Sequence, residues 1–165
     1  MPDSIDLAAY SVFTPPDPFE DHSGPFYFRI HGDASKTGTV HCVLPTEPRH
    51  GNYAGGVHGG ATLTFADYAL CLIAGRAADG GTNTVFAVTV SIAVEFLDSG
   101  RVGLPLEASG EPLQVTGRLA FARGSSAAST TDGTPTLTSG MPKKALSAAI
   151  RMSQAAATSR PALRV

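Results

Sequence analysis

A histidine followed by two glycines, at residues 58–60, stands directly before an apolar segment that has the pattern of a helix. This segment contains a single carboxylate, Asp67, at a place where a hydrophobic residue would be expected. A carboxylate is costly to remove from water unless another group satisfies it or a reaction uses it. Asp67 is therefore a candidate functional residue. The alternative is a structural carboxylate that Thr or backbone donors cap.

The two glycines could supply hydrogen-bond donors to a substrate. If the helix begins near His58, the N–H groups of Gly59 and Gly60 have no acceptor within it and point out of its positive end. Such donors can stabilise a developing oxyanion, and glycine lets a ligand approach the backbone closely. The alternative is that both glycines only permit close packing against a strand.

Gly59 and Asp67 are eight residues apart in the sequence. Along one α-helix this separation is about 12 Å, which is too long for both groups to act on one carbonyl carbon. Either the two groups serve different purposes, or two chains assemble the site, with the helix start of one facing Asp67 of the other. A two-fold symmetric dimer would then hold two equivalent sites.

The composition and the remaining motifs disfavour several other classes of protein. The net charge is −2 and no basic cluster exceeds the pair Lys143-Lys144, so nucleic-acid binding is not expected. The five histidines form no His-Glu-x-x-His motif and no pairing with cysteine, so we expect no metal site. The sequence also lacks the Gly-x-Ser-x-Gly motif of serine hydrolases and the glycine-rich loop that holds nucleotide phosphates.

We expect a soluble, cytoplasmic protein without membrane association. The N-terminal residues contain no basic region followed by an apolar core, so no secretory signal is visible. The longest apolar run, at residues 69–74, is far shorter than the roughly 20 residues that a membrane-spanning helix needs. Cys42 and Cys71 fall inside apolar elements, and we interpret both as reduced core residues.

Hydrophobic periodicity predicts an α+β domain. The helical pattern extends over residues 57–77, and its apolar residues cover nearly the whole circumference, so the helix should be buried on most sides. One long helix followed by several antiparallel strands indicates a sheet that curls around that helix. The predicted strands are residues 26–30, 37–44, 84–97, 104–115, 117–123 and 131–139.

Both ends of the chain are predicted to lie outside this domain. Residues 1–25 are rich in proline and are expected to form an irregular N-terminal arm. The domain itself spans residues 26–145, and residues 146–165 form a C-terminal extension that we expect to be partly mobile. Within this region, a short helix is predicted at residues 142–154 and a mobile tail from residue 155 onward.

The motif and the strand that follows it resemble those of a known enzyme family. The pattern Asn52-x5-His58-Gly59-Gly60-x6-Asp67, followed by the apolar strand at residues 88–97, resembles the phenylacetate-degradation-type (PaaI-like) acyl-CoA thioesterases of the hotdog-fold superfamily. The resemblance implies an antiparallel sheet of five or six strands wrapped around one long central helix, in homodimers that often pair into homotetramers. In such enzymes the carboxylate of one subunit works with the oxyanion-binding backbone of its partner.

The resemblance implies a role for each residue of the motif. Asp67 would attack the thioester carbonyl or activate a water molecule, and the N–H of Gly59 would polarise the thioester oxygen. Asn52 would position the water or the carboxylate. His58 would orient the loop or assist the departing thiolate. Thr89 falls where the family commonly has Ser or Thr, and its hydroxyl could bond Asp67 or the attacking water.

The implied reaction is hydrolysis of an acyl- or aryl-CoA thioester to a free acid and CoA, with coenzyme A present only as part of the substrate. The strand has Ala93 where the family often has Asn, so one polar contact is not expected here. Residues predicted to contact the substrate are Gly60, Phe65, Tyr68 and Phe86. Cations available for the CoA nucleotide are Arg101, Arg123, Lys143 and Lys144.

Two other functions are compatible with the same fold. One is a non-catalytic acyl-CoA-binding module, which would have no need of a desolvated carboxylate. The other is a hydratase or dehydratase, whose usual motif order fits poorly with a histidine followed by two glycines. The sequence also leaves the acyl group open between aromatic and medium-length aliphatic groups, because a fold does not determine its substrate.

Overall fold

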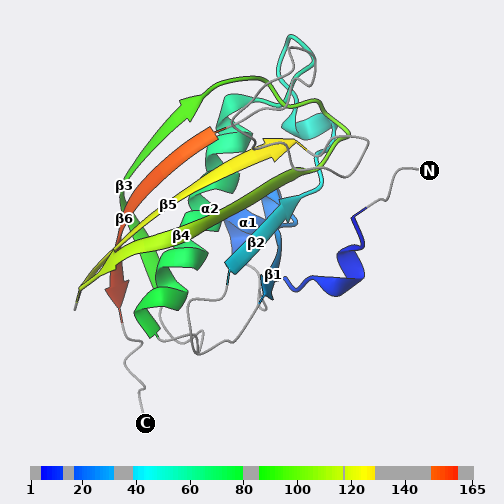
Figure 1. The fold of residues 1–165 in the computed structure, drawn as a ribbon. Helices are drawn as coiled ribbons and strands as arrows, with labels where there is room; N and C mark the ends of the chain where they lie inside the picture. Colours follow the sequence, from blue (N-terminus) through cyan, green and yellow to red (C-terminus); the bar gives the residue numbers. More distant parts are fainter. Residues whose placement is uncertain are drawn as a thin grey trace, which may run out of the picture.

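A long helix, α2 (Gly59–Asp79), lies at the centre of the molecule, and one antiparallel sheet curls around it (Figure 1). The computed structural model describes residues 5–12, 17–31, 39–79, 86–116, 118–128 and 150–159. This arrangement confirms the predicted α+β architecture, with six strands in the sheet.

The six strands pair only in antiparallel fashion, in the order β1-β2-β4-β5-β6-β3. Strands β1 and β3 therefore form the two edges of the sheet within this chain. The strands are β1 (Tyr27–His31), β2 (Thr39–Leu44), β3 (Phe86–Phe96), β4 (Leu106–Val115), β5 (Leu119–Ala128) and β6 (Ile150–Ser159).

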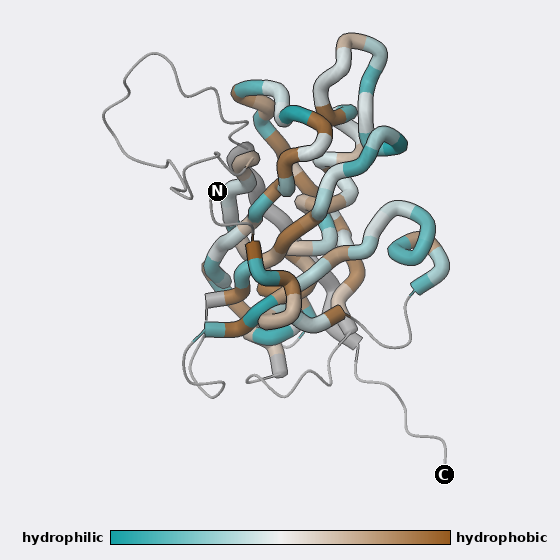
Figure 2. Tube along the Cα trace, turned by 90° about the vertical axis from the view of Figure 1, so that its right-hand side faces the viewer, coloured by the Kyte–Doolittle hydropathy of each residue, from teal (hydrophilic) through white to brown (hydrophobic). Residues whose placement is uncertain are grey.

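Helix α2 is buried on most of its circumference, as its apolar sequence predicts. It packs against β2, β3, β4, β5 and β6, and hydrophobic segments lie along the inside of the fold (Figure 2). One stripe of the helix is exposed at its N-terminal end and half-buried further along, and its residues recur at a spacing of four and therefore share one face. This exposed stripe consists of Gly59, Leu63, Asp67 and Cys71.

The C-terminal part of the chain differs from the prediction. Residues 150–159 form β6, which lies between β5 and β3 inside the sheet. The predicted helix at residues 142–154 and the tail from residue 155 are therefore wrong where they overlap this strand, and the domain extends beyond residue 145. Alanine-rich segments favour helix by intrinsic propensity, but pairing with two neighbouring strands overrides that preference. The strand predicted at residues 131–139 lies outside the described residues.

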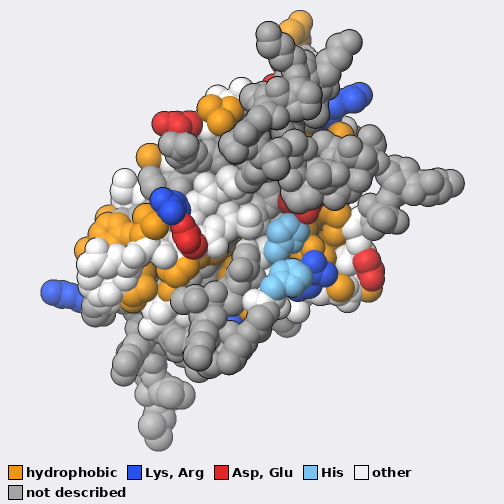
Figure 3. All heavy atoms as spheres, viewed as in Figure 1, with side chains coloured by type: hydrophobic (Ala, Val, Ile, Leu, Met, Phe, Trp, Pro, Cys, Tyr) orange, Lys and Arg blue, Asp and Glu red, His pale blue; other side chains and the backbone are white. Residues whose placement is uncertain are grey.

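The N-terminal arm is more regular than predicted. It contains a 3-10 turn, η1 (Leu7–Ala9), and a short helix, α1 (Pro18–Ser23), whose N-terminus is capped by the side chain of Asp17. On the outer face of the sheet, the Tyr10 hydroxyl lies 2.8 Å from Nδ1 of His41, and Nε2 of His41 lies 3.0 Å from Glu107. Histidine, arginine and acidic side chains are visible on this face in Figure 3. The arm is therefore anchored to the outside of β2, through a histidine that also pairs with β4.

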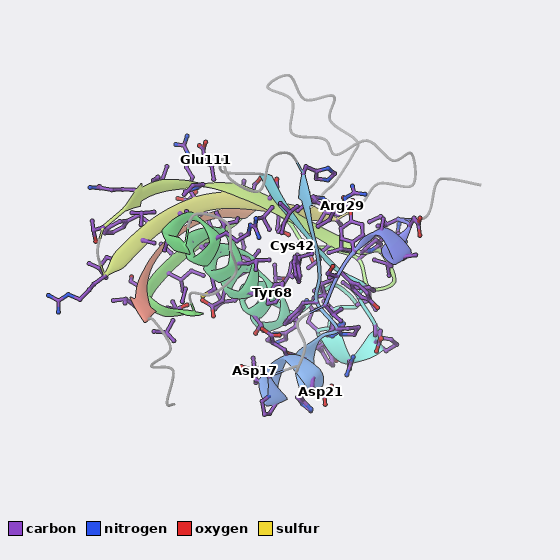
Figure 4. The ribbon with its side chains drawn as sticks, turned by 90° about the horizontal axis from the view of Figure 1, so that it is seen from below. Asp17, Asp21, Arg29, Cys42, Tyr68 and Glu111 are labelled. Carbon is purple, nitrogen blue, oxygen red and sulfur yellow. The ribbon has the colours of Figure 1, made fainter. Side chains whose placement is uncertain are left out.

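A second 3-10 turn, η2 (Pro48–His50), contacts the C-terminal end of the short helix α1. Nδ1 of His50 accepts the N–H of Glu47, so its Nε2 carries the hydrogen that is donated to Ser23 O at 3.0 Å. Figure 4 shows the resulting layers from below, with Glu111 and Arg29 on the sheet side and α1, which carries Asp21, on the opposite side.

Candidate active site

Asp67 and Thr89 meet where the exposed stripe of α2 borders the edge strand β3. The hydroxyl of Thr89 donates a hydrogen bond to Oδ1 of Asp67. The carboxylate is half-buried, and Thr89 is exposed. The sulfur of Cys71, one helical turn after Asp67, lies 3.3 Å from the Thr89 hydroxyl oxygen. The structure thus brings Asp67 and Thr89 together, as the family resemblance implies. It also places beside them the thiol of Cys71, which was predicted to be a core residue.

A β-bulge in β3 makes this contact possible. The register of β3 against β6 shifts between Thr89 and Ser91. Before the bulge, odd-numbered positions face α2, because Thr89 bonds Asp67. After it, even-numbered positions face the helix, because Ile92 and Val94 pack against the core. An extra residue in one strand changes which positions point inward. The same strand can therefore make the polar contact through Thr89 and the apolar contacts through Ile92 and Val94.

The start of α2 is capped by His58. Its Nδ1 accepts the N–H of Gly60 at 2.9 Å, and its carbonyl oxygen accepts the first helical hydrogen bond, from Thr62, at 3.0 Å. A Cβ atom at residue 60 would lie 3.0 Å from this ring nitrogen, so glycine allows the close approach. His58 thus accepts the N–H of Gly60 in this structure, and contact of Gly60 with a substrate stays a prediction.

Gly59 keeps its N–H available to a ligand. Among the described residues, none accepts a hydrogen bond from this N–H, and Gly59 is exposed. The ring of Phe96, at the far end of β3, lies 3.8 Å from where a Cβ of residue 59 would stand. The helix start therefore offers one accessible donor next to an aromatic ring, at the positive end of a 21-residue helix.

The side chain of Asn52 organises the loop that leads into α2. Its Oδ1 accepts the N–H groups of Ala54 and Gly56 at 2.9 and 3.1 Å, and its Nδ2 donates to Val57 O at 3.3 Å. Gly55 takes a positive φ of 84° at the tip of the turn. The amide of Asn52 is thus engaged with its own loop, and in this chain it positions the helix start rather than the Asp67 carboxylate.

The predicted substrate-contacting aromatic residues lie in different surroundings. Phe65 is fully buried, and its ring packs against Phe26 at a centroid distance of 6.0 Å. Tyr68 is also buried and lies 4.8 Å from the same ring, and burial raises the pKa of its hydroxyl. Both contribute to the core, so a single chain does not support their predicted contact with a substrate. Phe86 is the first residue of β3, and its side chain is outside the described part of the molecule.

Of the cations considered for a CoA nucleotide, Arg123 is already paired. Its Nε and a terminal nitrogen both reach Oε1 of Glu111, at 2.7 and 2.5 Å, on strands β5 and β4. Arg101 is exposed in the segment after β3, where it forms an isolated bridge with Gly56. Lys143 and Lys144 lie outside the described residues. Of the two described candidates, Arg101 thus lies beside the loop that leads into α2.

Within the described ranges, no group of three or more His, Cys, Asp or Glu side chains is arranged to hold a metal ion. None of the helices in the same ranges combines the length and the apolar character that crossing a membrane requires.

Comparison with known proteins supports the fold and indicates a family. Residues 54–125 match the family model described as the Thioesterase superfamily, and this range contains Gly59, Asp67 and Thr89. No curated protein sequence matches the chain.

Solved structures with a similar fold include three from bacteria. The protein smu.793 from Streptococcus mutans, bound to acetyl CoA, is 16% identical with a TM-score of 0.60, over 90% of this chain and 96% of that one. A hypothetical thioesterase protein from Streptococcus pneumoniae, with coenzyme A, is 16% identical with a TM-score of 0.57, over 82% and 86%.

The third is a variant of the phenylacetic acid degradation protein PaaI from Thermus thermophilus. It is 16% identical with a TM-score of 0.58, over 86% of this chain and 98% of that one. At such identities the likeness establishes the fold alone, and it confirms that this chain has a hotdog fold.

Replacing His58 tests whether its side chain acts as a helix cap. We expect His58→Ala to lower the free energy of unfolding by about 0.5–2 kcal/mol, because the N–H of Gly60 loses its acceptor. His58→Asn should restore wild-type stability, since asparagine is among the best residues at this position. Chemical denaturation followed by circular dichroism measures the difference. Equal stability of the Ala variant and the wild type would contradict the capping role.

Proposed function

We propose that this protein is an acyl-CoA thioesterase of the Thioesterase superfamily, closest in kind to the PaaI-like group. The proposal rests mainly on one observation. A half-buried carboxylate, Asp67, held by the Thr89 hydroxyl, shares the exposed stripe of α2 with the accessible N–H of Gly59. The family match over residues 54–125 and the CoA ligands named for two structural neighbours support the same substrate class.

The chemistry follows from these two groups. The N–H of Gly59 donates a hydrogen bond to the thioester oxygen and stabilises the negative charge that develops there. Asp67 attacks the carbonyl carbon, the C–S bond breaks, and CoA leaves as a thiolate that takes a proton from water. Water then hydrolyses the acyl-aspartyl anhydride to the free acid. In the alternative route, Asp67 takes a proton from a water molecule as that water attacks the carbon, and the C–S bond then breaks as the departing CoA sulfur takes that proton from Asp67, which leaves the free acid.

Both routes require two subunits. Gly59 and Asp67 lie eight residues apart on one rigid helix, a separation of about 12 Å. A hydrogen-bond donor and a nucleophile that act on one carbonyl group must lie much closer together. In a two-fold dimer with antiparallel α2 helices, Gly59 of one subunit can face Asp67 of its partner, and two such sites form.

The surface beside the site suits such an association. Among the described residues β3 is an edge strand, and none of them forms a neighbouring strand on its outer side. Val88 and Val90 on this strand are 48% and 60% exposed. We therefore propose a homodimer that joins along β3 and the exposed stripe. Pairing of dimers into a tetramer is also compatible with the fold.

Hydrolysis of a panel of acyl-CoA thioesters tests the proposed activity. The panel should include acetyl, medium-chain aliphatic, benzoyl and phenylacetyl groups. We expect release of free CoA by the wild type, and a decrease of about 10²–10⁴-fold in Asp67→Asn because the nucleophile or base is lost. Asp21→Asn, at an exposed position of α1, is the matched control and should retain full activity. Saturable binding without acid release would favour a binding module, and hydration of crotonyl-CoA would favour a hydratase.

Mixed dimers test whether the two groups act across subunits. Gly59→Pro removes the N–H at the first helical position, where proline is well tolerated, whereas Gly59→Ala retains it. A Cβ at residue 59 makes only ordinary contacts, so both variants should fold. Gly59→Pro and Asp67→Asn should each be nearly inactive. Refolding them together at equal concentration should restore about a quarter of wild-type activity, because half of the dimers then contain one intact site. No gain on mixing would contradict a shared site.

The same geometry predicts which residues meet at the two-fold axis. Leu63 lies halfway between Gly59 and Asp67, so antiparallel pairing places it opposite its own copy. Its exposure of 38% leaves it free for this contact. Leu63→Cys, in a protein that also carries Cys71→Ser, should form an inter-subunit disulfide on oxidation, as seen by non-reducing electrophoresis. Phe19→Cys, 61% exposed on α1, is the matched control and should not cross-link. Absence of a Leu63→Cys cross-link would exclude this register.

A further inference from the structure

We propose that Cys71 is a positioning residue for the reaction, with its thiol donating a hydrogen bond to Thr89 and thereby directing the Thr89 proton to Asp67. This inference rests on the proposed thioesterase function and goes beyond it, because it adds a residue that acts through Thr89 and not on the substrate. It also corrects the sequence interpretation of Cys71 as a core residue.

The side chains of Cys71, Thr89 and Asp67 contact one another in that order. Asp67 and Cys71 are separated by one turn of α2, so their side chains lie on the same face of the helix. Thr89 reaches this face from β3 because of the bulge that follows it. Its hydroxyl oxygen lies 3.3 Å from the sulfur of Cys71, within hydrogen-bonding distance for sulfur, and it bonds Oδ1 of Asp67.

The number of protons decides the direction of these hydrogen bonds. A carboxylate can only accept, and a threonine hydroxyl has a single proton to donate. Since the Thr89 proton is directed to Asp67, the Thr89 oxygen can only accept from Cys71. The thiol must therefore be the donor, which gives the order Cys71 S–H to Thr89 O–H to Asp67. Hydrogen bonds arranged head to tail in this way polarise and strengthen one another.

The other cysteine shows what a purely structural thiol looks like in this fold. Cys42 is fully buried in β2, and burial raises the pKa of its thiol. Cys71 lies instead on the exposed stripe, only partly covered, beside the residue proposed as nucleophile or base. In this position its hydrogen bond restrains the rotation of the Thr89 hydroxyl and, through it, the orientation of the carboxylate.

A double-mutant cycle tests this role. Cys71→Ala should lower kcat about 3- to 10-fold with little change in KM, because one hydrogen bond is lost at a residue that does not touch the substrate. Cys71→Ser, which keeps a donor, should recover most of the lost kcat. In a Thr89→Val background, which has no hydroxyl, Cys71→Ala should have no further effect on kcat. Cys42→Ala controls for the loss of a thiol as such and should leave kcat unchanged.

A spectroscopic measurement tests the hydrogen bond without using activity. In Cys42→Ala protein, the only remaining S–H stretching band in the Raman spectrum belongs to Cys71. The expected result is a band shifted to lower frequency in this protein, which moves to higher frequency on Thr89→Val replacement. An unshifted band in the Cys42→Ala protein would overturn the proposal.

The outcomes separate this inference from the proposed function. If the wild type hydrolyses a thioester and Asp67→Asn does not, the proposed function holds. An unchanged kcat in Cys71→Ala would then overturn the role of Cys71 alone, and so would an equal loss with and without the Thr89 hydroxyl. If the wild type hydrolyses none of the thioesters, both the function and the positioning role are overturned.

Discussion

Burial of α2 inside the curled sheet is the constraint on which the rest of this structure depends. A helix that is apolar on nearly all sides must be covered on nearly all sides, and a twisted antiparallel sheet can wrap around it. Five strands pack against α2 and bury its large residues, including Phe65, Leu70 and Ile73. The exposed stripe remains at least partly accessible. The carboxylate and the helix-start N–H can therefore meet a ligand along this stripe.

The polar groups of the site depend on local departures from regular structure. The bulge in β3 turns Thr89 toward Asp67 and still lets Ile92 and Val94 pack on the core. In a strand without the bulge, positions 89 and 92 would point to opposite faces. The loop before α2 is likewise irregular, and hydrogen bonds from the Asn52 side chain hold it in shape. Both devices position reactive groups without contributing an atom to the proposed chemistry.

The helix cap and the helix length together define what the site can do. His58 takes the N–H of Gly60, so only Gly59 offers an accessible donor of the two glycines. The rise of an α-helix is fixed, so the distance from this donor to Asp67 cannot shorten within one chain. A reaction that uses both groups therefore needs a second copy. The uncovered edge strand and the exposed stripe lie next to each other, where such a copy would bind.

Much of the fold could be predicted from the sequence, because helical and strand periodicity are local properties. The helix was predicted at residues 57–77 and is observed as Gly59–Asp79, and five of the six strands lie close to their predicted positions. The strand β6 could not be predicted, because its alanines carry a helical preference and its pairing with β5 and β3 joins distant parts of the chain.

For the site, the sequence by itself determined which groups are chemically unusual: a carboxylate in an apolar helix, and glycines at the start of that helix. The distance between these groups along α2 also follows from the sequence, because the rise of a helix converts residue spacing into distance. The tertiary structure decided which neighbours these groups have. It brought Thr89 of β3 to Asp67 through the bulge, placed Cys71 beside Thr89 and turned Phe65 toward the core. The cap of the Gly60 N–H by His58, by contrast, joins residues two apart in the sequence. The contact of Thr89 with α2 joins segments that lie far apart in the sequence, so no local pattern encodes it.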